Sequence, residues 1–395
     1  MIRHVIYLVE QPLDQRNFDR FGIQTLLDNG FDVSVIDCTQ FRFPRVNPAT
    51  PIIQTRRPIR TMACTSESQA LTAISQMAAG TFVVNLLGYC PETYPVYKAL
   101  SKMRVPYGVD VLNALPPPFE NGTAVSRKVR QVLNVDFQRA VRTLAQTGRN
   151  ILYRAKGRRL RGATFWFAGG SESPRDFFFP RDAQTRILWM HSIDYDLYLA
   201  EKDRPMEIAD KAVFLDQYLP FHHDFHYEGR RNPVGPEAYY SRLSALFVTL
   251  ERRLGLSTEV AGHPRSHSDD GYSRYFGGRP VIYSRTANLV KNSKLVIAHY
   301  STAVNLAVLF RKPVLFVTTK QLQKSGQGVY IETTARWLGK KVVDLDGPLE
   351  HVDWDRELSV DEASYASYQS SFISTTEAPA VPSWQILADV LKQMD

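Results

Sequence analysis

The sequence predicts an α/β protein of two domains, each built on a parallel sheet. The chain has 395 residues, which is more than one hydrophobic core usually organises. Short apolar runs alternate with helical stretches along most of its length, and this alternation is typical of parallel sheets covered by helices. We expect one domain over residues 1–205, a second over 206–380 and a C-terminal helix over 381–395.

The first domain opens with a strand, a helix and a second strand. HVIYLVE (4–10) and FDVSVIDC (31–38) have the apolar character of buried strands, and the helical stretch between them (18–30) is closed by Gly30. The same alternation continues, with a helix over 66–80, a strand over 81–88, a helix and strand within 95–111, and strands over 161–170 and 186–196.

The second domain repeats this pattern. A strand over 211–220 runs into a proline turn, and a helix over 236–256 has Pro236 near its start and Gly255 near its end. Further strands are expected within 257–270, 295–299, 313–322 and 341–348, with a helix over 301–310. The tail from Ser367 to Pro382 is expected to be loosely structured.

Several classes of protein are disfavoured by composition. The cysteines Cys38, Cys64 and Cys90 are odd in number and far apart, so neither disulfides nor a zinc site is predicted. No G-x-G-x-x-G motif indicates a nicotinamide or flavin cofactor. No apolar run is long enough to span a membrane, and the N-terminal apolar run soon meets Glu10 and Asp14, unlike a secretion signal. We therefore expect a cytoplasmic protein.

Positive charge is concentrated in residues 126–162, which carry eleven Lys or Arg and one acid, Asp136. Apolar residues in this segment fall close to helical spacing: Val129, Val132, Leu133, Phe137, Val141 and Leu144. The segment fits either a helix with a solvated polar face or a surface for anionic lipid head groups or a phosphorylated lipid carrier. Nucleic acid is not predicted as a partner, because no nucleic-acid motif accompanies the charge.

A group of polar residues stands between an apolar strand and an apolar helix in the second domain: His299, Tyr300, Ser301 and Thr302. Ser301 and Thr302 fall at the expected N-cap and first turn of the helix. Hydroxyls and free backbone amides there could hold a phosphate, although ordinary helix capping would need only one hydroxyl.

A second polar group follows the strand that ends near residue 262. His263 and Pro264 come first, and Arg265 follows them. A protonated histidine at a strand end can stabilise a departing phosphate oxygen, and an arginine adds charge to the same place. The order His-Pro, then a strand ending in Ser-Thr, is more specific than either feature alone.

On these motifs the second half resembles the nucleotide-binding half of GT-B glycosyltransferases, especially bacterial sialyltransferases and related capsule enzymes that use CMP-activated sugars. The resemblance implies a GT-B-like fold, two Rossmann-like domains facing a central cleft. FLDQYLP (214–220) resembles the strand that opens the nucleotide half of such enzymes. The nucleotide-binding residues implied by the resemblance are Asp216, Gln217, His263, Pro264, Arg265, His299, Ser301 and Thr302.

The acidic motif that carries the general base in those families has no counterpart upstream of the second domain, and Asp269-Asp270-Gly271 follows the His-Pro pair instead. An inverting transfer needs a carboxylate that accepts the proton of the attacking hydroxyl. We expect Asp194 in this role first, Asp196 second and Asp216 third. The catalytic set is then Asp194 or Asp196 together with His263.

The N-terminal half resembles the opening of uncharacterised proteins from bacterial surface-polysaccharide gene clusters, with Arg20-Phe21-Gly22 after the first strand. By that resemblance this half binds the acceptor. Arg20, Gly22 and Glu10 would then face the cleft, although Arg20 fits a surface ion pair equally well.

Together these features predict an inverting, metal-independent glycosyltransferase without a cofactor besides its nucleotide-sugar donor. It would move an acidic sugar of the sialic, pseudaminic, legionaminic or Kdo kind from CMP to a glycan or lipid-linked saccharide of a capsule or lipopolysaccharide, at the inner face of the cytoplasmic membrane. D-x-D pairs at Asp194/Asp196 and Asp344/Asp346 keep a metal-assisted mechanism open. The alternatives are a UDP- or GDP-sugar enzyme, a CDP-glycerol-type phosphotransferase, and a non-catalytic membrane-associated binding module.

Overall fold

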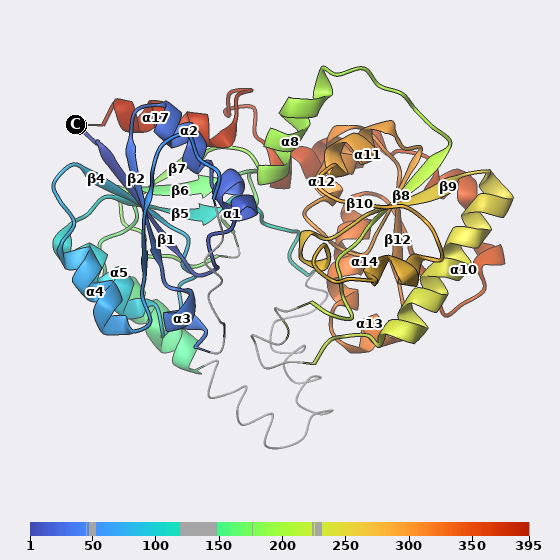
Figure 1. Cartoon of the computed structure of the whole chain (residues 1–395), viewed down its shortest axis with the longest axis horizontal. Helices are drawn as coiled ribbons and strands as arrows, with labels where there is room; N and C mark the ends of the chain where they lie inside the picture. The colour runs from blue at the N-terminus through green and yellow to red at the C-terminus, as the bar shows by residue number, and fades with distance from the viewer. Residues whose placement is uncertain are drawn as a thin grey trace.

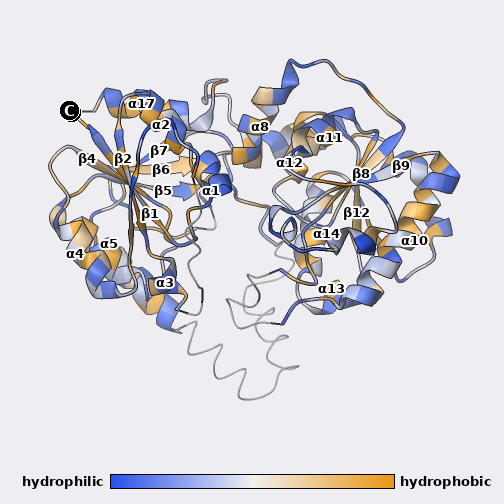
Figure 2. Cartoon of the chain, viewed as in Figure 1, coloured by the Kyte–Doolittle hydropathy of each residue, from blue (hydrophilic) through white to orange (hydrophobic). Residues whose placement is uncertain are grey.

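The computed structural model describes residues 1–44, 46, 53–118, 148–175, 177–222, 225 and 231–394. Two α/β domains stand side by side, each with a sheet sandwiched between helices (Figure 1). Every strand pairing inside the two sheets is parallel. Hydrophobic residues concentrate in the strands and on the helix faces turned toward them (Figure 2). The predicted α/β class with two parallel sheets is therefore confirmed.

The first sheet has seven strands in the order β3-β2-β1-β4-β5-β6-β7. Its strands are β1 (His4–Val9), β2 (Asp32–Asp37), β3 (Arg60–Ala63), β4 (Thr81–Asn85), β5 (Tyr107–Val111), β6 (Phe165–Ala168) and β7 (Arg186–Trp189). The helices that accompany them are α1 (Gln15–Arg20), α2 (Ile23–Asp28), α3 (Thr39–Arg42), α4 (Glu67–Ser75) and α5 (Tyr94–Met103). The strand order reverses between β1 and β4, so their carboxyl ends open a crevice at the sheet edge.

The second sheet has six strands in the order β10-β9-β8-β11-β12-β13. They are β8 (Lys211–Leu215), β9 (Ser257–Ala261), β10 (Val281–Ile282), β11 (Leu295–Ala298), β12 (Val314–Thr318) and β13 (Val342–Asp344). The helices are α8 (Ile193–Lys202), α10 (Pro236–Leu254), α11 (Thr286–Asn292), α12 (Val304–Leu309), α13 (Lys320–Lys324), α14 (Gly328–Trp337), α15 (Trp354–Glu357) and α16 (Glu362–Tyr368).

Helix α10 illustrates how the sequence sets an element. Pro236 occupies its first turn, and Gly255 ends it with φ 65°, a left-handed conformation that glycine adopts without steric cost. The helix buries one apolar stripe, made of Tyr239, Tyr240, Leu243, Leu246, Phe247 and Leu250. The three- and four-residue spacing of that stripe is the helical period, so the predicted helix is confirmed.

The C-terminal helix α17 (Ser383–Lys392) returns to the first domain and lies against α2 (Figure 1). Trp384, Leu387 and Leu391 belong to the core of the first sheet. The indole of Trp384 lies over Gly22, where an added Cβ would be 2.1 Å from the indole Cγ, and it donates to the Arg20 carbonyl at 2.8 Å. The chain therefore crosses between the domains twice, once before β8 and once before α17.

Three predicted elements differ from the observed ones. The predicted helix over 18–30 is two helices, α1 and α2, because Gly22 takes φ 59° between them. The predicted strand over 186–196 ends at Trp189, and α8 begins at Ile193. The predicted helix over 301–310 begins only at Val304.

The segment from 367 to 382 is more ordered than expected. It contains a π-helical turn over Gln369–Ile373 whose Phe372 and Ile373 are buried in the second core. Ser374 then forms a bridge with His191. Of the basic segment, residues 126–147 lie outside the described residues, whereas residues 148–157 form a helix.

The predicted domain boundary falls between α8 and β8. In the structure, Tyr195 and Tyr198 of α8 pack against the core of the second sheet. No helix in the described part of the chain is long and apolar enough to cross a membrane.

Candidate active site

The carboxyl end of β8 organises the loops of both neighbouring strands. Directly after β8, Asp216 accepts a hydrogen bond from the backbone N–H of His263 at 3.3 Å, at the end of β9. The next residue, Gln217, accepts one from the N–H of Tyr300 at 3.2 Å, at the end of β11. Because parallel strands end at the same sheet edge, two consecutive side chains bring the His-Pro loop and the Ser-Thr loop together.

The carboxylate of Asp216 is buried and fully engaged. It also accepts from the N–H of Tyr218 at 2.9 Å and from the Tyr272 hydroxyl at 2.9 Å. Burial raises the pKa of this carboxyl to about 6, against the lowering effect of these hydrogen bonds. Asp216 therefore lies beneath the ligand-facing surface as a positioning residue, and its predicted role as a proton acceptor is not supported by its surroundings.

His263 lies half-buried at the mouth of this edge. Its Nδ1 accepts from the backbone N–H of Arg265 at 3.3 Å, which requires that Nδ1 carry no proton and places the ring proton of the neutral form on Nε2. The ring stacks parallel to Tyr218, with 6.3 Å between centroids. The loop thus orients the neutral imidazole with Nε2 as its N–H donor.

Ser301 and Thr302 form a turn that precedes α12. The Ser301 hydroxyl accepts from the N–H of Ala303 at 3.2 Å, and the Thr302 carbonyl accepts from the N–H of Asn305 at 2.9 Å. Both residues are partly exposed at the sheet edge. The Tyr300 hydroxyl is held by Gln327. The predicted pair is therefore next to the His-Pro loop, on a turn and not in the first turn of the helix.

His299 belongs to the interior. It is fully buried, and its ring nitrogens bond the Tyr239 hydroxyl and the Val317 carbonyl, both at 2.7 Å. Burial lowers the pKa of its imidazole to about 4. Both ring nitrogens have hydrogen-bond partners inside the core. This geometry supports a structural role for His299 and does not support the predicted contact with a nucleotide.

The two acids predicted as general base lie at the domain junction, in the first turn of α8. Asp194 is buried and accepts from the amide of Asn305 at 3.2 Å. Asp196 accepts from the N–H of Ser383 at 2.9 Å and from its hydroxyl at 3.1 Å. Burial raises the pKa of both carboxyls, to about 6 for Asp196. Asp196 thus caps the start of α17, and neither acid lines one of the two cavities described next.

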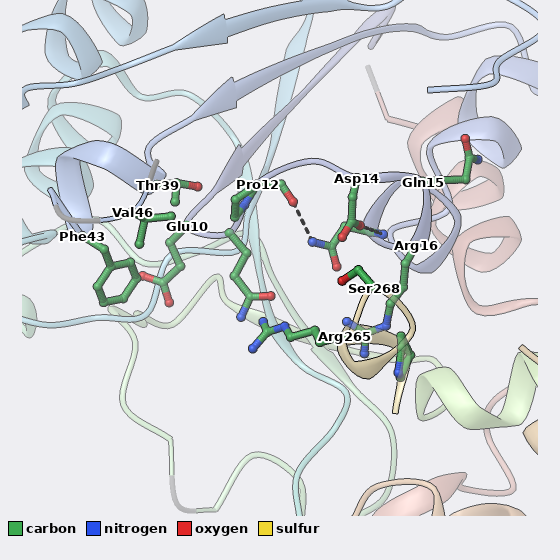
Figure 3. A pocket seen from close by; sticks show the side chains of 13 residues that line it. Glu10, Pro12, Asp14, Gln15, Arg16, Thr39, Phe43, Val46, Arg265 and Ser268 are labelled. Carbon is green, nitrogen blue, oxygen red and sulfur yellow. Dashed lines mark hydrogen bonds between the residues drawn. The ribbon is translucent and has the colours of Figure 1, made fainter. Parts of the chain in front are cut away.

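The first cavity, of about 650 Å³, lies between the domains. The first domain contributes the loop after β1 with α1, and residues that follow β2 (Figure 3). The second domain contributes Pro264, Arg265 and Ser268. In Figure 3, Arg265 points into the space between the two walls, and Arg16 lies beside Ser268. The predicted cleft between the domains therefore exists, with the His-Pro loop as one wall. We call it the interdomain cavity.

The second cavity, of about 530 Å³, belongs to the first domain. We call it the aromatic cavity. The ends of β4 and β5 contribute Asn85 and Asp110 to its lining, and the aromatic walls include Tyr89, Tyr153 and Phe177–Phe179. The other charged or amide side chains that line it are Glu10, Glu92, Asn150 and Arg154. Glu10 lines both cavities and therefore marks their junction.

Of the polar side chains in the aromatic cavity, one lacks a hydrogen-bond partner within the described part of the chain and another has a raised pKa. Asn85 is fully buried, and its Nδ2 has no hydrogen-bond partner among the described residues. Asp110 accepts from the N–H of Leu112 at 2.7 Å, and burial raises the pKa of its carboxyl. Glu10, by contrast, is paired with Arg42 at 3.1 Å. A usable signal for Asp110 and Asn85 is present in the sequence, because each stands at the end of an apolar strand.

Within the described residues, no group of three or more His, Cys, Asp or Glu is arranged to hold a metal ion. Asp344 and Asp346 are engaged elsewhere: Asp346 pairs with Arg242 and accepts from the N–H of Lys320 at 2.8 Å. Independence from metal stays a prediction.

No model of a protein family matches the sequence, and no curated protein matches it either. Solved structures do resemble it. The wall teichoic acid polymerase TagF, as an H444N variant soaked with CDPG, has 11% identity, with 99% of this chain and 88% of TagF covered and a TM-score of 0.53. MurG from Acinetobacter baumannii has 12% identity, coverage of 99% and 100%, and a TM-score of 0.46. MnaA from S. aureus, solved with UDP, has 13% identity, coverage of 98% and 95%, and a TM-score of 0.47.

The two parallel sheets and the match to TagF define the fold of this chain as GT-B. At these identities the likeness concerns the fold alone. None of the three structures is a sialyltransferase, so the resemblance to that family stays a prediction.

Proposed function

We propose that this chain is a transferase of surface-polymer synthesis that uses a cytidine-linked donor, in the first place a CMP-activated acidic sugar. The observation that carries the proposal is the placement of the His-Pro loop. Asp216 and Gln217 hold this loop beside the Ser301–Thr302 turn, and Pro264 and Arg265, next to His263, line together with the first domain a cavity large enough for a nucleotide sugar.

The proposed reaction needs stabilisation of a departing phosphate. The acceptor oxygen attacks the anomeric carbon, the bond from that carbon to the phosphate oxygen breaks, and its electron pair stays on CMP. The Nε2–H of His263 and the guanidinium of Arg265 offer a donor and a positive charge to that oxygen. Preorganised groups of this kind are worth several kcal/mol in a transition state, typically about 3–4 kcal/mol for one donor.

We propose Asp110 as the carboxylate that accepts the acceptor's proton, in place of Asp194 and Asp196. Asp110 lines the aromatic cavity, whose rings suit stacking against a saccharide and whose junction with the interdomain cavity lies at Glu10. A raised pKa brings a carboxyl closer to neutral pH, where a general base is most effective. The acceptor would be a glycan or a lipid-linked saccharide.

A second candidate is a CDP-glycerol-type phosphotransferase. It is favoured by the match to TagF, a wall teichoic acid polymerase, whose TM-score of 0.53 lies above those of MurG and MnaA. The same loops would then hold two phosphates of the donor. The acceptor oxygen would attack the phosphorus next to glycerol, and the bond from that phosphorus to the bridging oxygen would break, with its electron pair staying on CMP.

A thermal-shift panel of CMP, CDP, UDP and GDP tests the donor class. A ligand at a hundred times its dissociation constant adds about 2.7 kcal/mol of stability. Selective stabilisation by CMP or CDP supports the proposal. Selective stabilisation by UDP or GDP would mean that the donor is a UDP- or GDP-sugar and not a cytidine-linked one. No response to any nucleotide favours a non-catalytic binding module. CMP released from a CMP-sugar or from CDP-glycerol, measured by chromatography with a crude glycan acceptor, then separates the two candidates.

We also propose that the protein is cytoplasmic and binds the inner face of the membrane through its basic segment. In the described part, Ile151 and Leu152 are 63% and 53% exposed, and Arg158 and Arg159 are exposed as well. Exposed apolar side chains next to positive charge suit an anionic lipid surface.

A further inference from the structure

Arg16 stands on the wall of the interdomain cavity opposite the His-Pro loop. It comes from α1 in the first domain, whereas Arg265 comes from the second, and both line the same cavity (Figure 3). Arg16 is exposed to the cavity and makes no ion pair or hydrogen bond with any described residue. By contrast, Arg42 in the same domain is paired with Glu10 at 3.1 Å.

The charges around Arg16 favour an anion. The pKa of its guanidinium is lowered, mainly by partial burial and further by the positive charges of Arg20 and Arg265. The negative charges of Asp14 and Asp194 act in the opposite direction. Asp14 is the nearest acid in sequence, yet its Oδ1 accepts the N–H of Asn17 at 2.7 Å and caps α1. A bound anion between the walls would relieve the repulsion of the arginines.

Two buried polar atoms at the same cavity also lack partners among the described residues. They are the Oδ1 of Asn17 and the Oγ1 of Thr39, whose residues are 3% and 2% exposed. Buried polar atoms are normally hydrogen-bonded. Hydroxyls on a ligand would supply the missing bonds, so the wall that carries Arg16 suits a ligand that is both anionic and hydroxylated.

We propose that Arg16 binds an anionic group on the donor other than the phosphate next to the cytidine. That group is the carboxylate of an acidic sugar or the second phosphate of a CDP-linked donor. The inference rests on the proposed function, and it makes Arg16 the residue that selects donors with a second negative charge. Arg265 and His263 take the first phosphate from the opposite wall.

Isothermal titration of wild type and Arg16→Gln with CMP, CMP-N-acetylneuraminic acid and CDP tests the proposal. The wild type should bind at least one of the two ligands that carry a second anionic group more tightly than CMP, which carries only the phosphate. Arg16→Gln should weaken that ligand at least tenfold and leave the affinity for CMP within twofold. The ligand that is affected identifies the carboxylate or the second phosphate as the partner.

Arg56→Gln serves as the matched control, because Arg56 is in the same domain, is exposed and lies outside both cavities. Equal losses for CMP and the larger ligands in Arg16→Gln, or no loss for any of them, would overturn the inference while cytidine binding upholds the proposed function. Absence of cytidine-nucleotide binding by the wild type would overturn both.

Discussion

Asp216 and Gln217 show how single residues shape this site. Each contributes one acceptor atom to a backbone N–H at the end of a neighbouring strand. Both contacts are made to backbone N–H groups, and not to the polar side chains, of the two loops. At the residue scale the site thus consists of His263, Arg265, Ser301 and Thr302 over a layer that positions them.

Replacement of His263 by alanine should lower turnover with a cytidine-linked donor by about a hundredfold or more, as expected when one transition-state contact is lost. The fold should stay intact, because the residue is half-buried and its ring hydrogen bond to the Arg265 N–H lies within its own loop. Donor consumption and the melting temperature are the measurements. His267→Ala, an exposed histidine in the same loop, is the control, and wild-type turnover in His263→Ala would remove the imidazole from the mechanism.

The pH profile tests Asp110. Burial raises the pKa of this carboxyl, so its base form is lost as pH falls through a value above the ordinary one for aspartate, about 3.9. The kcat/KM of the wild type should therefore rise with pH through that raised pKa, and Asp110→Asn should lower activity and abolish this limb. Asp194→Asn is the comparison. If the rise of kcat/KM with pH is lost in Asp194→Asn and kept in Asp110→Asn, Asp194 is the general base.

At the scale of elements, the apolar periodicity of the sequence predicted buried strands and long helices well. β1, β2, β8 and β11 lie within the predicted ranges. β1, β8 and β11 are runs of mostly buried apolar residues, whereas in β2 buried apolar residues alternate with polar ones. β3 gave no such signal, since all four of its residues are exposed at the sheet edge. The end of β7 was placed too late because the apolar pattern continues into α8.

The break between α1 and α2 could not be predicted from local sequence, because it depends on Trp384 from the other end of the chain. Gly22→Ala should destabilise the fold strongly. A left-handed alanine costs about 1–2 kcal/mol, and the overlap with the indole adds about 1–3 kcal/mol. Gly30→Ala is the control, because Gly30 has φ 90° but no atom within 4 Å of an added Cβ. Equal losses in chemical denaturation would show that Trp384 contributes nothing.

The helix over 148–157 carries the membrane proposal. Lys156 lies 4.4 Å from the Tyr153 ring centroid, and Arg154 lies 5.6 Å from that of Phe178. Both cations are therefore engaged with aromatic rings, and Arg158 and Arg159 are the better residues for charge reversal.

Arg158→Glu with Arg159→Glu should strongly reduce sedimentation with phosphatidylglycerol–phosphatidylcholine vesicles at low salt, since each positive charge near such a surface is worth about 1 kcal/mol. Arg252→Glu with Arg253→Glu makes the same change of charge on an exposed part of α10. Vesicle binding that survives the first pair, or falls equally with both, would refute the role of this segment.

At the scale of the molecule, the sequence predicted the two parallel sheets and the cleft between the domains. Of the residues that line the interdomain cavity, it predicted those of the second domain's His-Pro loop but not Arg16 and Asn17 of the first domain. The His-Pro and Ser-Thr loops stood out because each follows an apolar strand within one domain. Arg16 and Asn17 did not, because their relation to those loops depends on how the domains face each other. The acids of α8 lie outside both cavities because the end of β7 leads into the domain junction, and their role as general base stays a prediction.

The return of α17 to the first domain has a consequence for the order of events on the ribosome. Trp384, Leu387 and Leu391 complete the core of the first sheet, yet they follow the whole second domain in the sequence. Domains usually fold as units in the order of their synthesis. Here the second domain should reach its native state while the first still waits for its last helix.

Nascent chains in which residue 382 is followed by a linker long enough to fill the exit tunnel should therefore show a protease-resistant second domain and a sensitive first one. The first domain should gain resistance only in chains in which α17 has also emerged from the tunnel. Early resistance of the first domain would mean that α17 is an addition to a finished core. On the expected outcome, a chaperone would meet the earliest-made part of this chain for longest.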